Sequence, residues 1–162
     1  MLPQINKILY ATDLSDSARH AFNYAALLAD RLDAEITVLH VIDDITWAGK
    51  NLLVDFLGEQ KLEELKQHKK SKYLETITER IEAFCDESGD QLKECRYMVR
   101  HRMIKDGNPA EEILEEAHGG DYDMVIIGTH GLGMVANALM GDTARRVIRR
   151  CLKPVTVIRL PE

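Results

Sequence analysis

The sequence predicts an α/β fold in which five parallel strands form one sheet between two layers of helices. Short β-prone apolar runs alternate along the chain with segments of helical periodicity, and the runs at residues 35–42 (EITVLHVI) and 123–128 (DMVIIG) are nearly continuous. Continuous apolar strands are typical of parallel sheets that are covered on both faces. Right-handed helical crossovers between such strands give a doubly wound sandwich, for which we expect the strand order 3-2-1-4-5.

The first half of the chain contains two of the expected strands, at residues 5–11 and 35–42. A serine hydroxyl at position 15 or 17 is expected to cap the helix between them. A second, longer helix should end near residues 88–89, where a glycine follows. Apolar residues at helical spacing predict the inner faces of both helices. These residues are Phe22, Ala25, Ala26, Ala29 and Leu32 in the first helix and Leu74, Ile77, Ile81 and Phe84 in the second.

The segment between the second strand and the long helix, residues 43–59, has no regular pattern but contains Trp47 and an apolar cluster around Phe56. This much apolar area needs to be covered. A short amphipathic helix packed on the sheet, a lid over a site and a dimer contact are all open, and ordinary packing is our prediction. The charged segment after it, KLEELKQHKKSKY, is interpreted as a solvated helix face.

The second half of the chain continues the alternation of strands and helices. A more polar strand at residues 94–103 is expected at an edge of the sheet. Asn108 and Pro109 predict a helix start, because the asparagine caps the first turn and proline suits the first helical position. Gly119 and Gly120 should end that helix. The remaining expected elements are a strand at 123–128, a helix at 141–151 with Ala144, Val147, Ile148 and Cys151 inward, and a strand at 154–160.

Composition excludes several classes of protein. The 162 residues are 45% hydrophobic and 30% charged, which suits one folded domain over residues 1–162 rather than a disordered chain. The apolar runs are too short to cross a membrane, and the start of the chain lacks the pattern of a secretory signal. A net charge of −6 argues against nucleic acid as a partner. Three widely spaced cysteines favour a reduced, cytoplasmic protein over a disulfide framework or a zinc site.

A glycine-rich segment follows the strand at residues 123–128. Gly128, Gly131 and Gly133 are followed by Gly141, which comes just before a helix. Glycines allow backbone N–H groups to approach a phosphate, and a helix N-terminus favours an anion; serving only as turns is the alternative. The segment is neither a Walker loop nor the dinucleotide fingerprint. In the expected strand order this segment meets Thr12 and Asp13 at the switch point of the sheet, where such folds bind ligands.

Three segments of the chain resemble the universal stress protein family. The spacing of Gly128, Gly131 and Gly141 matches the nucleotide-binding pattern of the family, as does the wording GTHG. The opening ILYATDLSDSA is similar to the first strand and turn of the family, and CLKPVTVIRLP to its last helix and strand. Because the three segments occur in the same order as in the family, the resemblance extends over essentially the whole chain. It implies the adenine-nucleotide alpha-hydrolase-like fold, and a homodimer joined through the C-terminal strand.

The resemblance also implies a site for ATP or AMP. Adenine would lie near Asp13 and Val41, and ribose and phosphate would lie near the glycines and the two residues after Gly141. His130, within the glycine segment, would contact phosphate or remain exposed. The nucleotide-binding residues implied in this way are Ala11, Thr12, Asp13, Val41, Gly128, Thr129, His130, Gly131, Gly141, Asp142 and Thr143.

One residue departs from the family pattern, because Asp142 stands where ATP-binding members have serine or threonine. An ionised carboxylate cannot donate to a phosphate. At about 5 Å from a phosphate it would cost roughly 1–3 kcal/mol, which is about a 4- to 150-fold loss of affinity. A Mg²⁺ ion held by Asp142, a hydroxyl from Thr143, or the charge of Arg145 or Arg146 would offset that cost. Capping of the last helix is another role for Asp142.

These observations predict an adenine-nucleotide-binding regulatory protein of the stress response, a homodimeric sensor rather than an efficient enzyme. The sequence shows no evident nucleophile, metal cluster or pair of general bases, so we expect slow ATP hydrolysis at most, no catalytic residues and no protein metal site. The other five histidines lack metal-like spacing and are interpreted as structural or surface residues. The alternative is a nucleotide-independent homodimeric interaction module, which Asp142 favours. A phosphoacceptor receiver domain does not fit, because its lysine ends the last strand whereas Lys153 precedes one. A redox flavoprotein is disfavoured because no Thr/Ser-rich phosphate loop follows the first strand.

Overall fold

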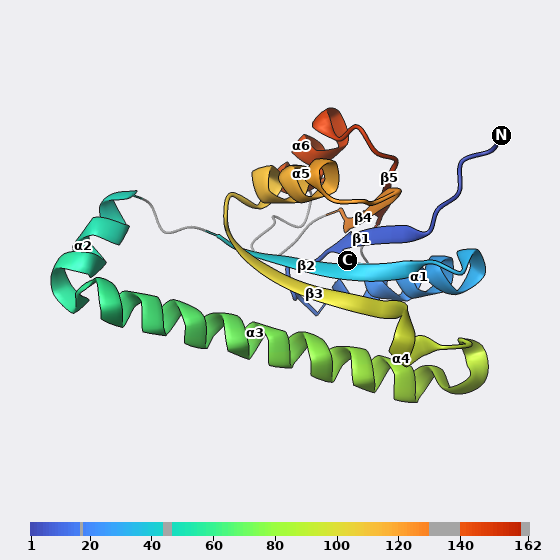
Figure 1. The fold of residues 1–162 in the computed structure, drawn as a ribbon, viewed down its shortest axis with the longest axis horizontal. Helices are drawn as coiled ribbons and strands as arrows, with labels where there is room; N and C mark the ends of the chain where they lie inside the picture. The colour runs from blue at the N-terminus through green and yellow to red at the C-terminus, as the bar shows by residue number, and fades with distance from the viewer. Residues whose placement is uncertain (17, 44–46, 130–139, 160–162) are drawn as a thin grey trace.

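The computed structural model describes residues 1–16, 18–43, 47–129 and 140–159 (Figure 1). In this part of the chain five parallel strands form one sheet in the order β3-β2-β1-β4-β5, which confirms the predicted order and the edge position of the third strand. The strands are β1 (Lys7–Ala11), β2 (Glu35–Asp43), β3 (Val99–Gly107), β4 (Met124–Gly128) and β5 (Val155–Ile158).

Alternate residues of the central strands face two separate apolar clusters. On one face, Ile8 and Tyr10 of β1 pack with α1, α3 and α4. On the other face, Leu9 and Ala11 pack with α5 and α6. Both faces of β1 are therefore buried, as its continuous apolar sequence requires. The helices are α1 (Ala18–Leu32), α2 (Trp47–Leu57), α3 (Glu59–Ser88), α4 (Cys95–Met98), α5 (Pro109–Gly119) and α6 (Asp142–Arg150), with a 3₁₀ turn η1 (Gly89–Gln91).

Two predicted helix starts are present. The Ser15 hydroxyl oxygen accepts a hydrogen bond from the backbone N–H of Ala18 at 3.2 Å, so this serine caps α1. The Asn108 side chain accepts from the N–H of Glu111 at 3.2 Å, and Pro109 is the first residue of α5. Each cap fixes the start of a helix shortly after the end of a strand, α1 after β1 and α5 after β3.

Some predicted boundaries and inner faces are wrong. The third strand begins at Val99 rather than at residue 94, because residues 95–98 form the short helix α4. Leu32, Leu74 and Ile148 were expected to point inward, but each is exposed. Leu32 and Leu74 lie at the ends of their apolar stripes, and Ile148 lies beside buried Val147 on α6. Periodicity alone cannot show where a neighbouring element stops covering such a face.

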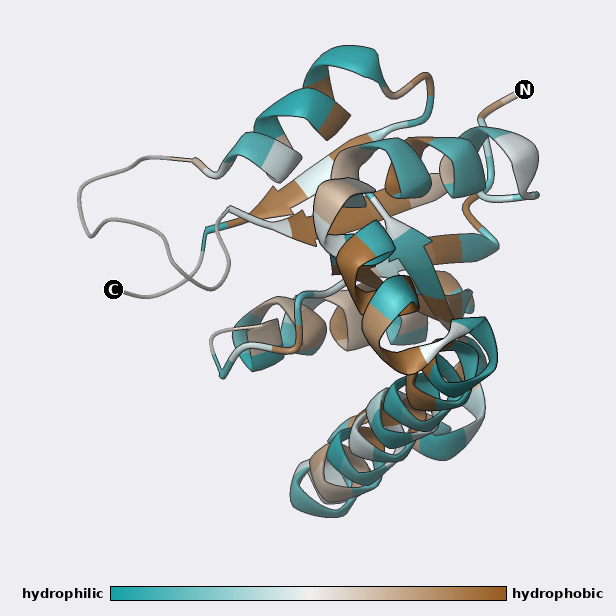
Figure 2. Cartoon of the chain, turned by 90° about the vertical axis from the view of Figure 1, so that its left-hand side faces the viewer, coloured by the Kyte–Doolittle hydropathy of each residue, from teal (hydrophilic) through white to brown (hydrophobic). Residues whose placement is uncertain are grey.

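The segment predicted as irregular, residues 43–59, contains the helix α2. Helix α2 and the N-terminal part of the 30-residue α3 extend away from the sheet (Figure 1). None of the α2 side chains that the structure describes is buried, although Figure 2 shows many hydrophobic residues along this helix. Phe56 is 84% exposed. The prediction that this apolar segment packs on the body of the protein is therefore wrong. We call α2 together with residues 59–72 of α3 the arm.

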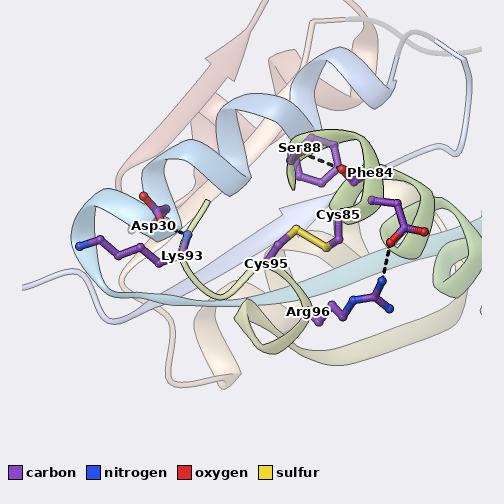
Figure 3. Close-up of a disulfide and its surroundings, with 8 residues drawn as sticks. Asp30, Phe84, Cys85, Ser88, Lys93, Cys95 and Arg96 are labelled. Carbon is purple, nitrogen blue, oxygen red and sulfur yellow. Dashed lines mark hydrogen bonds and ion pairs between the residues drawn. A yellow bond between two sulfur atoms is a disulfide. The ribbon is translucent and has the colours of Figure 1, made fainter. Parts of the chain in front are cut away.

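The prediction that all cysteines are reduced is also wrong. Cys85, near the end of α3, and Cys95, at the start of α4, form a disulfide (Figure 3). Their Cα atoms are 5.5 Å apart, within the range that a disulfide spans. The η1 turn reverses the chain between α3 and α4 and brings the two residues together, a contact that spacing in the sequence does not reveal. Cys151 is a free, half-buried thiol.

No helix in the described ranges is long and apolar enough to span a bilayer.

Candidate functional site

A cavity of about 520 Å³ lies where β1, β2 and β4 end and α6 begins. Parallel strands present their C-terminal ends at one edge of the sheet, so residues far apart in the sequence meet there. We call this space the strand-end cavity. His130 and Gly131 lie outside the described residues. The structure brings together the other nine predicted site residues as lining of the cavity: Ala11, Thr12, Asp13, Val41, Gly128, Thr129, Gly141, Asp142 and Thr143.

The loop after β1 holds its polar groups in fixed positions. The N–H of Thr12 continues the sheet by donating to the Leu39 carbonyl at 2.9 Å, and the Thr12 hydroxyl accepts from the N–H of Leu14 at 3.1 Å. Oδ1 of Asp13 accepts from the backbone N–H of Ser15 at 3.0 Å and from its hydroxyl at 2.7 Å. The carboxylate of Asp13 therefore stabilises the turn that follows it and is held at the edge of the cavity.

The opposite wall joins the end of β4 to the start of α6. The N–H of Thr129 donates to the Ile158 carbonyl of β5 at 2.9 Å, and the N–H of Gly141 donates to the Thr129 carbonyl at 2.5 Å. Gly141 is buried and directly precedes α6, whose first residues line the cavity. The partial positive charge of a helix N-terminus is thus directed at this space.

Asp142 is the first residue of α6, and Gly141 is the residue that caps this helix, so Asp142 does not cap it. Its carboxylate Oδ2 lies 3.0 Å from Nε of Arg146, one turn further along the helix. Both side chains are exposed, so the pair is worth little as stability. The pair does place the positive charge of Arg146 next to the Asp142 carboxylate, as expected if an arginine offsets the repulsion between Asp142 and a phosphate.

A third wall, which the sequence did not reveal, comes from β2 and α3. His40 is buried, and its ring lies 4.6 Å from the ring of Tyr73, centre to centre. Nζ of Lys69, one helical turn from Tyr73, lies 6.0 Å from the centre of the tyrosine ring. The charged segment of α3 is therefore more than a solvated face. The only signal for this wall was the i,i+4 spacing of Lys69 and Tyr73, which many surface helices share.

The protonation of two buried groups follows from their partners. Nδ1 of His40 lies 2.9 Å from the Thr12 carbonyl, which only accepts, so Nδ1 carries the proton. Burial lowers the pKa of His40 below its ordinary 6.5, which keeps the ring neutral at pH 7. The Tyr10 hydroxyl donates to the Ala18 carbonyl at 2.9 Å, and burial raises the pKa of Tyr10 to about 12. Both rings are thus neutral hydrogen-bonding groups.

The charges around the strand-end cavity are mainly negative. Asp13, Asp43 and Asp142 line it as carboxylates, and Lys69 lines it as an ammonium group. Within the described ranges no group of three histidine, cysteine or acidic side chains is arranged to hold a metal ion. The described lining therefore favours a ligand of low net negative charge, or one that brings its own cation.

The strand order and a ligand-sized cavity at the switch point define a doubly wound α/β protein whose site is built from strand ends. The sequence profile of the universal stress protein family matches residues 4–159, and the chain belongs to that family. It is 29% identical to universal stress protein MJ0577 of Methanocaldococcus jannaschii over 157 aligned residues, and the alignment covers 94% of each chain. It is 26% identical to universal stress protein YxiE of Bacillus subtilis, over 95% of this chain and 99% of the relative.

Solved structures have the same fold. The structure of MJ0577 superimposes with a TM-score of 0.70 and 26% identity, covering 99% of each chain. Universal stress protein UspA from Lactobacillus plantarum superimposes with a TM-score of 0.64 at 22% identity, covering 98% of this chain and 100% of its own. The family resemblance and the adenine-nucleotide alpha-hydrolase-like fold expected from the sequence are confirmed.

Proposed function

We propose that this protein binds an adenine nucleotide in the strand-end cavity and acts as a homodimeric sensor in the stress response. The observation that carries the proposal is the convergence of three strand ends and the N-terminus of α6 on one cavity of about 520 Å³. That volume is within the range of pockets that hold small ligands and cofactors. The nine residues that the family resemblance implies for base, ribose and phosphate and that the structure describes line this same space.

The distribution of groups in the cavity supports an orientation for the nucleotide. The buried glycine before α6 and the N–H groups of its first turn suit a phosphate. The end of β2 at Val41, next to the β1 loop with Asp13, suits the base, as the resemblance implies. A universal stress protein with the same fold has been crystallised in complex with cAMP, an adenine nucleotide with a single negative charge; its TM-score with this chain is 0.58 at 19% identity.

The charge of the cavity supports AMP or another nucleotide of low charge over free ATP. Each phosphate charge added near Asp142 meets a carboxylate that Arg146 offsets only in part, because the pair is exposed to solvent. Mg²⁺ would arrive with the nucleotide, bound to its phosphates, and Asp142 would face it. A nucleotide-independent interaction module remains the second candidate, and the position of Asp142 at the cavity is the observation that favours it.

Titration calorimetry with AMP, ADP and ATP, with and without Mg²⁺, tests this proposal on the unaltered protein, on Asp142→Ser and on Glu115→Ser. We expect the unaltered protein to bind AMP more tightly than Mg²⁺-free ATP. Asp142→Ser should increase the affinity for ATP by about 4- to 150-fold. Glu115→Ser is the control, because it removes an exposed carboxylate of α5 that does not line the cavity. Absence of binding in both the unaltered protein and Asp142→Ser would support the interaction module.

We propose that the homodimer forms through β5. This strand is at an edge of the described sheet, where it pairs with β4, and an unpaired edge is a template for a second copy. Val157→Asp should convert the dimer to a monomer in light scattering after size exclusion. His101→Asp, at an exposed position of the other edge strand, is the matched control. Circular dichroism checks that both variants are folded, and a folded Val157→Asp dimer would overturn this interface.

A further inference from the structure

A second cavity, of about 380 Å³, lies between α1, α3 and the sheet, which contributes Tyr10 of β1 and Val38 from the middle of β2. It shares Tyr10, Thr12 and Ala18 with the strand-end cavity but extends away from it, between the two helices. We call it the interhelical cavity. Of the predicted nucleotide contacts that the structure describes, Thr12 alone lines it. Its large apolar lining residues are Tyr10, Leu14, Phe22, Val38, Ile77, Ile81 and Phe84.

The interhelical cavity has an apolar interior and a charged opening. Most of its apolar residues are buried, whereas Asp16, Arg19, Arg80 and Ala83, which also line it, are exposed. A space with this distribution suits a ligand that has an apolar body and one charged end. Its volume is within the range of small-molecule pockets.

Among the described residues, Arg80 is the cation at the opening that has no ion-pair partner. Arg19 is paired with Glu87, so its charge is already balanced. Nη1 of Arg80 donates to the backbone carbonyls of Leu14 at 2.7 Å and of Ser15 at 3.2 Å. These carbonyls fix the guanidinium at the opening without neutralising it. Asp16 is the one carboxylate among the described lining residues, and it is exposed to solvent.

We propose that the interhelical cavity is a binding site for a small amphipathic carboxylate. Its aliphatic tail lies between α1 and α3, against Phe22 and Ile77, and its carboxylate pairs with the guanidinium of Arg80. Arginine suits this role because its planar group presents several N–H donors to a carboxylate, and Nη1 is already positioned by two carbonyls. This site is distinct from the proposed nucleotide site although the two share Tyr10, Thr12 and Ala18, and its test does not require a nucleotide.

Calorimetry with a series of straight-chain carboxylates from four to ten carbons, kept below their micelle concentrations, tests the proposal. Affinity should rise about fourfold for each added methylene group until the tail fills the cavity, and then stop rising. The alcohol of the same length should bind at least tenfold more weakly, because it lacks the charge that Arg80 recognises. No saturable binding at any chain length would overturn the proposal.

Four variants identify where the carboxylate binds. Arg80→Gln should weaken the carboxylate at least tenfold and leave the alcohol unchanged. Ala83→Phe narrows the opening with Arg80 intact and should weaken both. Lys69→Gln removes the ammonium group of the strand-end cavity, and Phe56→Ser reduces the exposed apolar surface of α2; both should leave binding unchanged. The proposal is wrong if folded Ala83→Phe protein binds as the unaltered protein does, or if Lys69→Gln or Phe56→Ser abolishes binding.

Discussion

The two halves of α3 have opposite relations to the rest of the molecule. The C-terminal half buries Ile77, Ile81 and Phe84 against the sheet and α1. The N-terminal half belongs to the arm and is largely exposed, as is α2 before it. Between them, Lys69 and Tyr73 line the strand-end cavity. One continuous helix therefore packs on the sheet at its C-terminal end and lines the strand-end cavity in its middle. Only the C-terminal end buries large apolar side chains against the sheet.

The largest effect should come from the buried half of α3. Ile81→Ala removes a side chain that is 5% exposed and should lower the free energy of unfolding by about 2–5 kcal/mol. Leu65→Ala, the matched change in the arm, should alter it by less than about 0.5 kcal/mol, because this leucine is exposed. Urea unfolding followed by circular dichroism measures both. Equal losses in the two variants would contradict the division of α3 into a packed and an unpacked half.

The disulfide at the packed end of α3 should have the next largest effect. Cys85 and Cys95 close a short loop, with a sequence separation of 10. Loop-closure entropy for a cross-link of this size predicts a loss of about 2–3 kcal/mol in the Cys85→Ser/Cys95→Ser double variant. Cys151→Ser, at the free thiol, is the control and should change stability little. Reduction of the unaltered protein with a phosphine should reproduce the loss, and an unchanged unfolding midpoint would contradict it.

The architecture was predictable because its signals are local. Continuous apolar runs identify buried parallel strands, the capping residues Ser15 and Asn108 mark helix starts, and Gly141 marks the edge of the site. The meeting of Asp13 with Gly141 at one cavity followed from the strand order, because parallel strands end at the same edge.

The features that escaped prediction depend on tertiary contacts. Helical periodicity identifies an apolar face but not whether anything covers it, which is why Leu74 was expected to be buried. The apolar content of residues 43–59 has the same limit, and it was the reason that α2 was expected to pack on the body of the protein. Cys85 and Cys95 meet only because a turn between two helices reverses the chain. Lys69 and Tyr73 reach the site because a long helix crosses near the end of β2, and their sequence is that of an ordinary charged helix.

The contact between the middle of α3 and β2 should make stability depend on pH. Burial lowers the pKa of His40 in the folded protein below its ordinary 6.5. Unfolding therefore takes up a proton between those two values, so stability should fall as pH decreases from about 6.5 toward the folded-state pKa. Nearby Asp13 acts against this shift, whereas Lys69 adds to it. Urea unfolding at several pH values should show a steeper fall in the unaltered protein than in His40→Gln.

A comparison with a second histidine makes this test specific. His20 on α1 lies against Tyr24, with ring centres 5.3 Å apart, and is only half-buried. His20→Gln is the matched control variant, because His20 does not line the strand-end cavity. If His40→Gln had the same pH profile as the unaltered protein, His40 would not be the source of the pH dependence. The prediction that the folded protein keeps this ring neutral next to α3 would then be wrong.

The smallest effect should come from the tip of the arm. Phe56→Ser removes a phenyl ring that is 84% exposed, and we expect the free energy of unfolding to change by less than about 0.5 kcal/mol. Leu62→Ser is the informative control, because Leu62 is only 8% exposed although the residues next to it in the sequence are exposed. Its loss should be clearly larger, since it removes buried apolar area and introduces a hydroxyl. If Phe56→Ser were as destabilising as Leu62→Ser, Phe56 would be buried in solution. The arm would then pack on the rest of the protein or form an interface with another chain.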